Sequence, residues 1–176
     1  MINNRYNIFH LLGEGRSKVY LCHDINYPSI PLAFKVIAPD TDIKETEYFK
    51  KEFLLLKKLN HPYILRVDKL GGVYKSIDER ISEKSLFITQ EFFDGKHIYE
   101  YNFTDNEELL KKIIVQLLDV LNYLHQSNYI YYDLKGDNIL LNISNDSPEI
   151  RLIDFGLTSH YFDEQNEIKG TAKYLA

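Results

Sequence analysis

Residues 131–141 read Tyr-Tyr-Asp-Leu-Lys-Gly-Asp-Asn-Ile-Leu-Leu. This loop places an acid at Asp133, a cation at Lys135 and an amide at Asn138, and the acid of an Asp-Phe-Gly motif follows at Asp154. Phosphoryl transfer requires such a set: a carboxylate that orients a hydroxyl, a cation for the moving charge, and hard oxygen ligands for Mg²⁺. Each motif taken singly is also consistent with an ordinary polar loop. The ordered set indicates phosphoryl-transfer chemistry.

The 176-residue chain has a net charge of −5 and one cysteine, Cys22. Its length is sufficient for one domain or two small lobes with a substantial apolar core. The acidic balance argues against general binding to nucleic acid or to an anionic membrane, so we expect neither as a partner. No apolar run reaches the roughly 18 residues of a membrane-spanning helix. A single cysteine excludes an internal disulfide and a cysteine-built zinc site, and we expect a reducing, cytoplasmic location.

The first half of the chain has the pattern of several strands and one helix. Residues 43–59 are predicted to be helical, because apolar residues such as Phe49 and Phe53 recur at helical spacing. The polar residues 75–84 are predicted to form a solvated loop. The predicted strands are residues 6–12, 18–23, 32–37, 64–70 and 86–93.

The second half begins after Asp94-Gly95, which breaks the pattern and predicts a hinge between two lobes. Thr104 and Glu107 form a capping-box signature, a hydroxyl followed three residues later by a glutamate. This signature predicts the start of a long helix over residues 105–125. The strands predicted after this helix are residues 139–141 and 150–153.

Three features of the first half are candidates for binding phosphate. Gly13 and Gly15 lie in a turn between two predicted strands, where glycines permit close backbone approach to phosphate oxygens. An ordinary hairpin turn is equally consistent with them. Lys35 lies in an apolar strand and is either a snorkelling strand lysine or a cation with an anionic partner. Glu52, in the next helix, is either that partner or a solvent-facing charge.

As an ordered set, these motifs resemble the eukaryotic-like Ser/Thr protein kinase superfamily over residues 6–176. The resemblance implies an α+β fold. Its N-lobe would be a five-stranded antiparallel sheet with one helix at residues 1–93, followed by a partial, mainly helical C-lobe at residues 94–176. It also implies ATP and Mg²⁺ as cofactors, and a protein with a Ser or Thr hydroxyl as substrate.

The same resemblance implies a role for each motif. Lys35 would hold the α- and β-phosphates of ATP, with Glu52 as its partner. Asp133 would be the catalytic aspartate, and Lys135 the lysine at the γ-phosphate. The implied metal ligands are Asn138 and Asp154. The implied nucleotide-binding positions are Leu12, Gly13, Gly15, Val19, Ala33, Lys35, Gln90, Glu91, Phe93 and Leu140.

The chain departs from the family pattern at three places in its motifs. The glycine turn is one residue short and lacks its third glycine, and Lys18 lies in that stretch. Tyr132 stands where the family usually has an arginine that pairs with a phosphorylated loop, so we expect activity independent of that pairing. Tyr131 stands where histidine is commoner, and we expect its ring to pack under Phe155.

The last departure is at Ala176, where the chain ends inside what resembles the close of the activation segment. In the family, a helical subdomain follows and covers the long helix over residues 105–125. We therefore expect an exposed apolar face on that helix, covered by a partner or by the missing C-terminal subdomain.

The leading hypothesis is the N-terminal fragment of an ATP-dependent Ser/Thr protein kinase domain. A nucleotide-binding pseudokinase or scaffold with little transfer activity is the alternative, because the glycine turn is short and the subdomain is missing. A small-molecule phosphotransferase of the aminoglycoside or choline kinase type is a third reading. Lys135, the Asp-Phe-Gly motif and Gly170-Thr171 argue against that third reading.

Overall fold

The computed structural model describes residues 1–104, 106–144 and 147–162, and its contacts divide the chain into two compact units. The first unit comprises Met1–Lys57 and Arg66–Phe92, and the second comprises Lys58–Leu65 and Phe93–Ala176. The short segment between the first helix and the next strand thus belongs with the second unit. Gly170, Thr171 and the chain end at Ala176 lie outside the described residues.

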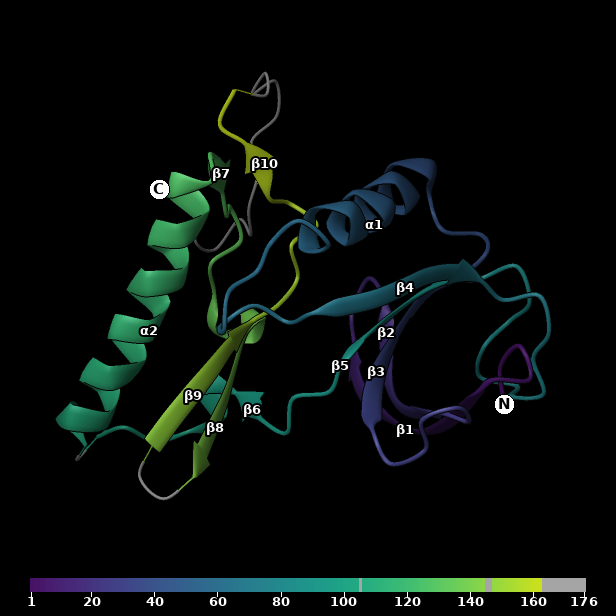
Figure 1. Cartoon of the computed structure of the whole chain (residues 1–176), viewed down its shortest axis with the longest axis horizontal. Helices are drawn as coiled ribbons and strands as arrows, with labels where there is room; N and C mark the ends of the chain where they lie inside the picture. Colours follow the sequence, from purple (N-terminus) through teal and green to yellow (C-terminus); the bar gives the residue numbers. More distant parts are fainter. Residues whose placement is uncertain (105, 145–146, 163–176) are drawn as a thin grey trace. The chain divides into compact units, whose positions relative to one another are not determined.

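The first unit contains the five-stranded antiparallel sheet and the single helix that the sequence predicts (Figure 1). The strand order is β1-β2-β3-β5-β4. Along β2, buried side chains alternate with more exposed ones, as a strand with one face on a core requires. The strands are β1 (Tyr6–Glu14), β2 (Lys18–Asp24), β3 (Pro31–Ile37), β4 (Val67–Gly72) and β5 (Leu86–Glu91). The core on one face is Ile2, Tyr6, Tyr20, Cys22, Phe34, Val36, Val73, Ile81 and Phe87.

Helix α1 (Ile43–Leu56) begins after Asp42, whose side chain accepts a hydrogen bond from the backbone N–H of Lys44. This bond satisfies one of the backbone donors that a helix start leaves unpaired. The helix buries Phe49 together with Glu52, so an acidic residue lies on its apolar side. A buried carboxylate requires a partner, and the site described below provides one.

Residues 75–84, in the loop between β4 and β5, are largely exposed, as predicted, but they include one buried residue. Val73 and Ile81 are buried in the core of the first unit, and Ile81 lies inside the range predicted to be solvated. The two ends of the loop pair through Val73 and Ser85, whose N–H and C=O groups are 2.8 Å apart. The burial of Ile81 was not predicted, because a single apolar residue among charged neighbours forms no periodic pattern.

The described residues of the second unit form one long helix and two small sheets (Figure 1), together with two 3₁₀ turns, so the fold class is α+β as expected. One sheet has the order β6-β8-β9, and β7 pairs with β10 in the other. The helix is α2 (Glu107–Gln126), and the 3₁₀ turns are η1 (Ile98–Glu100) and η2 (Gly136–Asn138). The strands are β6 (Lys96–His97), β7 (Tyr129–Ile130), β8 (Ile139–Ser144), β9 (Ser147–Leu152) and β10 (Ser159–His160).

Helix α2 begins two residues later than the capping-box signature predicts. The side chain of Asn106 caps the helix by accepting from the N–H of Leu109, whereas Thr104 donates its hydroxyl hydrogen to Asn102. Both Asn and Thr are good capping residues, and the asparagine nearer the helix takes the position. No helix among the described residues is both long and apolar enough to span a membrane.

One apolar face of α2 is exposed, as the sequence predicts. Ile113, Val120 and Leu124 form the buried side of the helix. The exposed apolar residues on the helix are Leu110, Ile114, Val115 and Leu118.

Candidate active site

In the first unit, Lys35 on β3 forms an ion pair with Glu52 on α1. Lys35 Nζ lies 2.7 Å from both carboxylate oxygens of Glu52. The two residues are only 9% and 4% exposed, and Nζ lies 6.0 Å from the centre of the Phe49 ring. Lys35 is therefore not a strand lysine that snorkels to solvent, and Glu52 is not a solvent-facing helix charge.

The register of the sheet shows which predicted nucleotide-binding residues share a face. Val19 lies directly opposite Lys35, and Ala33 lies directly opposite Gln90. Residues opposite each other and residues two apart on one strand share a face, so these four side chains lie on one side of the sheet. This is the face that carries the Lys35–Glu52 pair.

Lys18 belongs to the other face of the same sheet. It lies directly opposite Val36, a residue of the apolar core. It also precedes Val19 on β2, and the side chains of successive strand residues point to opposite faces of the sheet. Its Nζ lies 3.1 Å from a carboxylate oxygen of Glu14, and this hydrogen bond raises the pKa of the lysine. Lys18 therefore closes the hairpin across its two strands and does not share the face of Lys35.

The glycine turn leaves its backbone open. A Cβ atom added at Gly13 or at Gly15 would meet no other atom within 4 Å. Steric crowding within the chain therefore does not explain why these two positions are glycine. The turn is held by the Gly15 N–H, which donates to the Ser17 carbonyl at 3.0 Å. Leu12 lies at an irregularity of β1 just before the turn, where the β1–β2 register shifts. An open glycine backbone is suited to the approach of a ligand.

The other adenine-site residues predicted from the resemblance divide between the two units. Glu91 ends β5, and its N–H donates to the Arg66 carbonyl at 2.9 Å. Phe93 begins the main segment of the second unit, and its carbonyl accepts from the Gly95 N–H at 2.9 Å. Leu140 lies on β8 in that unit. Recognition of adenine by these residues stays a prediction.

In the second unit, the predicted catalytic residues Asp133 and Lys135 meet the predicted metal ligand Asn138 in one loop. Lys135 Nζ lies 2.8 Å from Asp133 Oδ2, and Asn138 Nδ2 donates to the same oxygen at 3.0 Å and to the Asp133 carbonyl at 2.8 Å. The turn η2 brings them together, because the Asn138 N–H donates to the Lys135 carbonyl at 3.0 Å. Asp133 is 8% exposed, so its carboxylate is buried, oriented and charge-compensated.

Asp154 follows β9 with a backbone φ of 60°, in the left-handed region that a non-glycine residue rarely adopts. Its side chain is exposed, and the Ile153 N–H donates to the Asn138 carbonyl at 2.9 Å. Asp154 is therefore tethered beside the Asp133 loop through its neighbour. Aspartate adopts this backbone region more readily than most other residues.

The side-chain oxygens of Asn138 and Asp154 are suited to bind a divalent cation whose remaining ligands come from other groups. The Nδ2 atom of Asn138 donates to Asp133, so the amide oxygen of Asn138 points away from Asp133. Amide and carboxylate oxygens are the hard ligands that Mg²⁺ prefers, together with substrate phosphates and water. No group of three His, Cys, Asp or Glu residues that could hold a metal ion occurs in the described part of the chain.

Tyr131 supports the Asp-Phe-Gly motif, as predicted for an aromatic residue at this position. Its ring lies edge-on to Phe155, with centroids 5.1 Å apart. Its hydroxyl also donates to the Ile153 carbonyl at 2.5 Å. This hydrogen bond could not be predicted from the sequence, because its acceptor is a backbone carbonyl 22 residues away.

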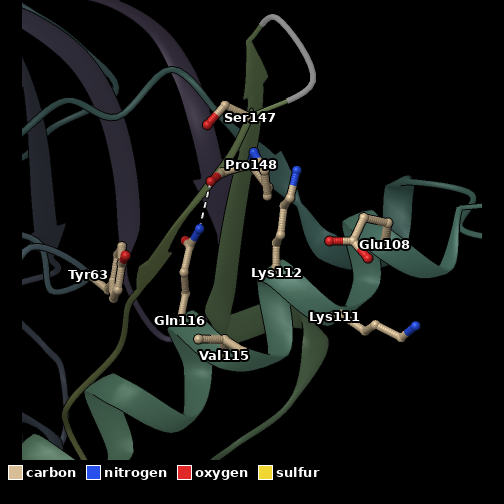
Figure 2. Close-up of a pocket in the computed structure, with 8 residues that line it drawn as sticks. All are labelled: Tyr63, Glu108, Lys111, Lys112, Val115, Gln116, Ser147 and Pro148. Carbon is tan, nitrogen blue, oxygen red and sulfur yellow. Dashed lines mark hydrogen bonds between the residues drawn. The ribbon is translucent and has the colours of Figure 1, made fainter.

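Gln116 on α2 links the helix to β9, a contact that could not be predicted from the sequence. Its amide donates to the Pro148 carbonyl at 2.7 Å and accepts from the Ile150 N–H at 3.0 Å, so it binds the edge of β9 (Figure 2). A polar residue among the apolar positions of a helix is the sequence feature that marks it. The open pocket beside it, about 420 Å³, contains no predicted site residue. The pocket is lined by Tyr63, Glu108, Lys111, Lys112, Val115, Gln116, Ser147 and Pro148.

The sequence of the chain is similar to that of a known protein family. The protein kinase domain family matches residues 6–176. The chain is 33% identical over 174 residues to Probable serine/threonine-protein kinase YbdM of Bacillus subtilis (strain 168), an alignment that covers 95% of the chain and 62% of that relative. It is 30% identical over 185 residues to Calcium-dependent protein kinase 4 of Plasmodium falciparum (isolate 3D7), covering 100% of the chain and 33% of that relative.

A third relative, Serine/threonine-protein kinase cds1 of Schizosaccharomyces pombe (strain 972 / ATCC 24843), is 29% identical over 182 residues, which is 98% of the chain and 35% of that relative. The chain thus spans less than two thirds of the length of each of these three relatives. The match of the family to nearly the whole chain agrees with the five-stranded sheet, the Lys35–Glu52 pair and the Asp133 loop. The chain therefore belongs to the protein kinase domain family.

Proposed function

We propose that this chain carries the nucleotide-binding and catalytic residues of an ATP-dependent Ser/Thr protein kinase. The observation that carries the proposal is the buried Asp133 carboxylate, which Lys135 and Asn138 hold at 2.8 and 3.0 Å. A carboxylate oriented by a cation and an amide is suited to receive a hydroxyl hydrogen bond at a phosphoryl-transfer site.

In this proposal the first unit binds the triphosphate. Lys35, oriented by Glu52, provides positive charge to the α- and β-phosphates. N–H groups of the glycine turn other than that of Gly15, which donates to Ser17, donate to the phosphate oxygens. Val19 and Ala33 share the sheet face of Lys35 and provide apolar surface for the base. These groups hold the nucleotide and do not react.

The second unit provides the transfer chemistry in this proposal. Asp133 accepts a hydrogen bond from the substrate hydroxyl and takes up its proton as the oxygen attacks the γ-phosphorus. A new oxygen–phosphorus bond forms, the bond to the oxygen bridging the β- and γ-phosphates breaks, and ADP leaves. Lys135 offsets the negative charge of the transferring group. Asn138 and Asp154 would hold Mg²⁺, which neutralises charge on the phosphates when bound.

The choice of a Ser or Thr hydroxyl rests on two supports. Lys135 stands two residues after Asp133, a feature that the resemblance assigns to the Ser/Thr branch. The relatives compared above are also named as serine/threonine-protein kinases in two of three cases. Neither support identifies the protein substrate.

Titration of the chain with ATP and Mg²⁺ by calorimetry, beside a phosphate-transfer assay on Ser/Thr and Tyr protein acceptors, tests the proposal. We expect binding, and transfer to Ser and Thr only. Lys35→Met should abolish transfer and weaken binding, whereas Lys69→Met, which removes an exposed lysine of the same sheet, should change neither. Binding without transfer would instead support a nucleotide-binding scaffold, and transfer unchanged by Lys35→Met would contradict the assigned role of Lys35.

A further inference from the structure

The β1 strand loses its regular pairing just before the glycine turn. Its register with β2 shifts between Ile8 and Leu11 and again between Leu11 and Gly13. Each shift places an extra residue on β1, so only the Leu11–Tyr20 pair joins the strands between the two irregularities. A bulge increases the local twist and leaves backbone groups without a strand partner. Strand pairing resumes beyond the second irregularity at Gly13–Val19 and Glu14–Lys18, so contacts made at the irregularities influence the direction of the glycine turn.

Arg80, in the loop between β4 and β5, provides such contacts at the first irregularity. Its Nη1 donates to the Phe9 carbonyl at 2.7 Å, although the two residues are 71 positions apart in the chain. The centre of its guanidinium also lies 5.3 Å from the centre of the Tyr20 ring. Arg80 thus contacts both strands, one through the backbone and the other through the ring of the residue that pairs with Leu11.

The guanidinium is itself held in place by its own loop. Asp78 accepts from Nε at 2.8 Å and from Nη2 at 2.6 Å, a two-bond arrangement that fixes the plane of the side chain. This hydrogen bonding lowers the pKa of Asp78, so its carboxylate stays ionised. Ile81, the next residue, is buried in the core and anchors the loop. The contact at Phe9 is therefore made by a preorganised group.

We propose that Arg80 is a positioning residue that sets the direction of the glycine turn by bridging β1 and β2 at the Phe9 carbonyl and the Tyr20 ring. The inference rests on the proposed function, in which the glycine turn binds the phosphates of ATP. Arg80 does not touch the nucleotide in this account. It restricts the motion of the hairpin, so that less ordering is required when the nucleotide binds.

Hydrogen exchange of the nucleotide-free chain tests the bridge directly, in peptides that cover residues 9–20. Arg80→Gln should speed exchange in these peptides about tenfold, because a hydrogen bond to a charged group is lost. Arg80→Lys keeps the charge without the planar fork and should give an intermediate rate. Lys75→Gln removes an exposed cation from the same loop and should leave the rate unchanged.

The KM for ATP then distinguishes a positioning role of Arg80 from a general contribution to stability. We expect Arg80→Gln to raise the KM for ATP about tenfold with a smaller change in kcat, and Arg80→Lys to restore part of the loss. Unchanged exchange in Arg80→Gln would overturn the proposal, as would faster exchange with an unchanged KM. If the unsubstituted chain binds no nucleotide, the proposed function fails, and the exchange rates alone decide whether Arg80 holds the turn.

Discussion

Lys35 Nζ lies 2.7 Å from both carboxylate oxygens of Glu52, and both side chains are buried within the first unit. Removing one partner of such a pair leaves a buried, uncompensated charge. We expect Glu52→Gln or Lys35→Met to lower the free energy of unfolding by about 3–5 kcal/mol. Urea denaturation measures this effect.

The double variant Lys35→Met with Glu52→Leu provides the control for this prediction. It removes both charges, so its loss of stability should be smaller than the sum of the two single losses. Additive losses would show that the two side chains do not stabilise each other and would contradict the account of the pair.

Stability at acid pH should depend on Asp24, which accepts hydrogen bonds from Arg5 at 2.6 and 2.8 Å. This bonding lowers the pKa of Asp24 below its ordinary value of 3.8. A carboxyl with a lowered folded-state pKa adds stability above its unfolded pKa, and this stability is lost as the pH falls through the lowered value. Urea unfolding at a series of pH values should therefore show a steep loss of stability below pH 3.8.

The loss of stability below pH 3.8, called the acid limb here, should be less steep in Asp24→Asn. At neutral pH this variant should also lower the free energy of unfolding by about 1.5–3 kcal/mol, because a charge-assisted hydrogen bond is lost. Asp40→Asn, which alters an exposed acid of the same unit, should leave the limb unchanged. An acid limb that is equally steep in Asp24→Asn and in the unsubstituted chain would exclude this role for Asp24.

Much of the first unit could be predicted from the sequence, since its strands and helix carry their own periodicity. The exception was Ile81, whose burial depends on a core assembled from distant strands. The start of α2 was also misplaced, because Thr104 and Asn106 are both good capping residues and only the local backbone selects between them.

The candidate site could be predicted where its residues are close in the chain. Asp133 and Asn138 lie in one turn, so their spacing alone brings them together. Lys35 and Glu52 lie on separate elements; the sequence pattern left their pairing open, and the family resemblance indicated that they pair. The contact of Arg80 with Phe9 joins residues with no shared pattern and could not be predicted.

The hydroxyl of Tyr131 should contribute to both stability and transfer. Tyr131→Phe removes the hydrogen bond to the Ile153 carbonyl and keeps the ring that packs against Phe155. We expect a loss of about 1 kcal/mol in the free energy of unfolding and a lower kcat, because Asp154 follows Ile153 directly. Urea denaturation and steady-state kinetics measure the two effects.

The matched control for Tyr131 is Tyr99→Phe, because the Tyr99 side chain is exposed. This variant should behave as the unsubstituted chain. A Tyr131→Phe protein with unchanged stability and unchanged kcat would show that the hydrogen bond to Ile153 has no part in holding the Asp-Phe-Gly motif.

The most direct test of the central claim is transfer of labelled γ-phosphate from ATP to a Ser/Thr protein acceptor by the chain and by Asp133→Asn. The variant removes the carboxylate that would take the hydroxyl proton, so we expect kcat to fall roughly 10²- to 10⁴-fold while ATP binding is retained. Asp137→Asn, an exposed acid of the same loop, should retain full transfer. Equal rates in the unsubstituted chain and Asp133→Asn would contradict the account.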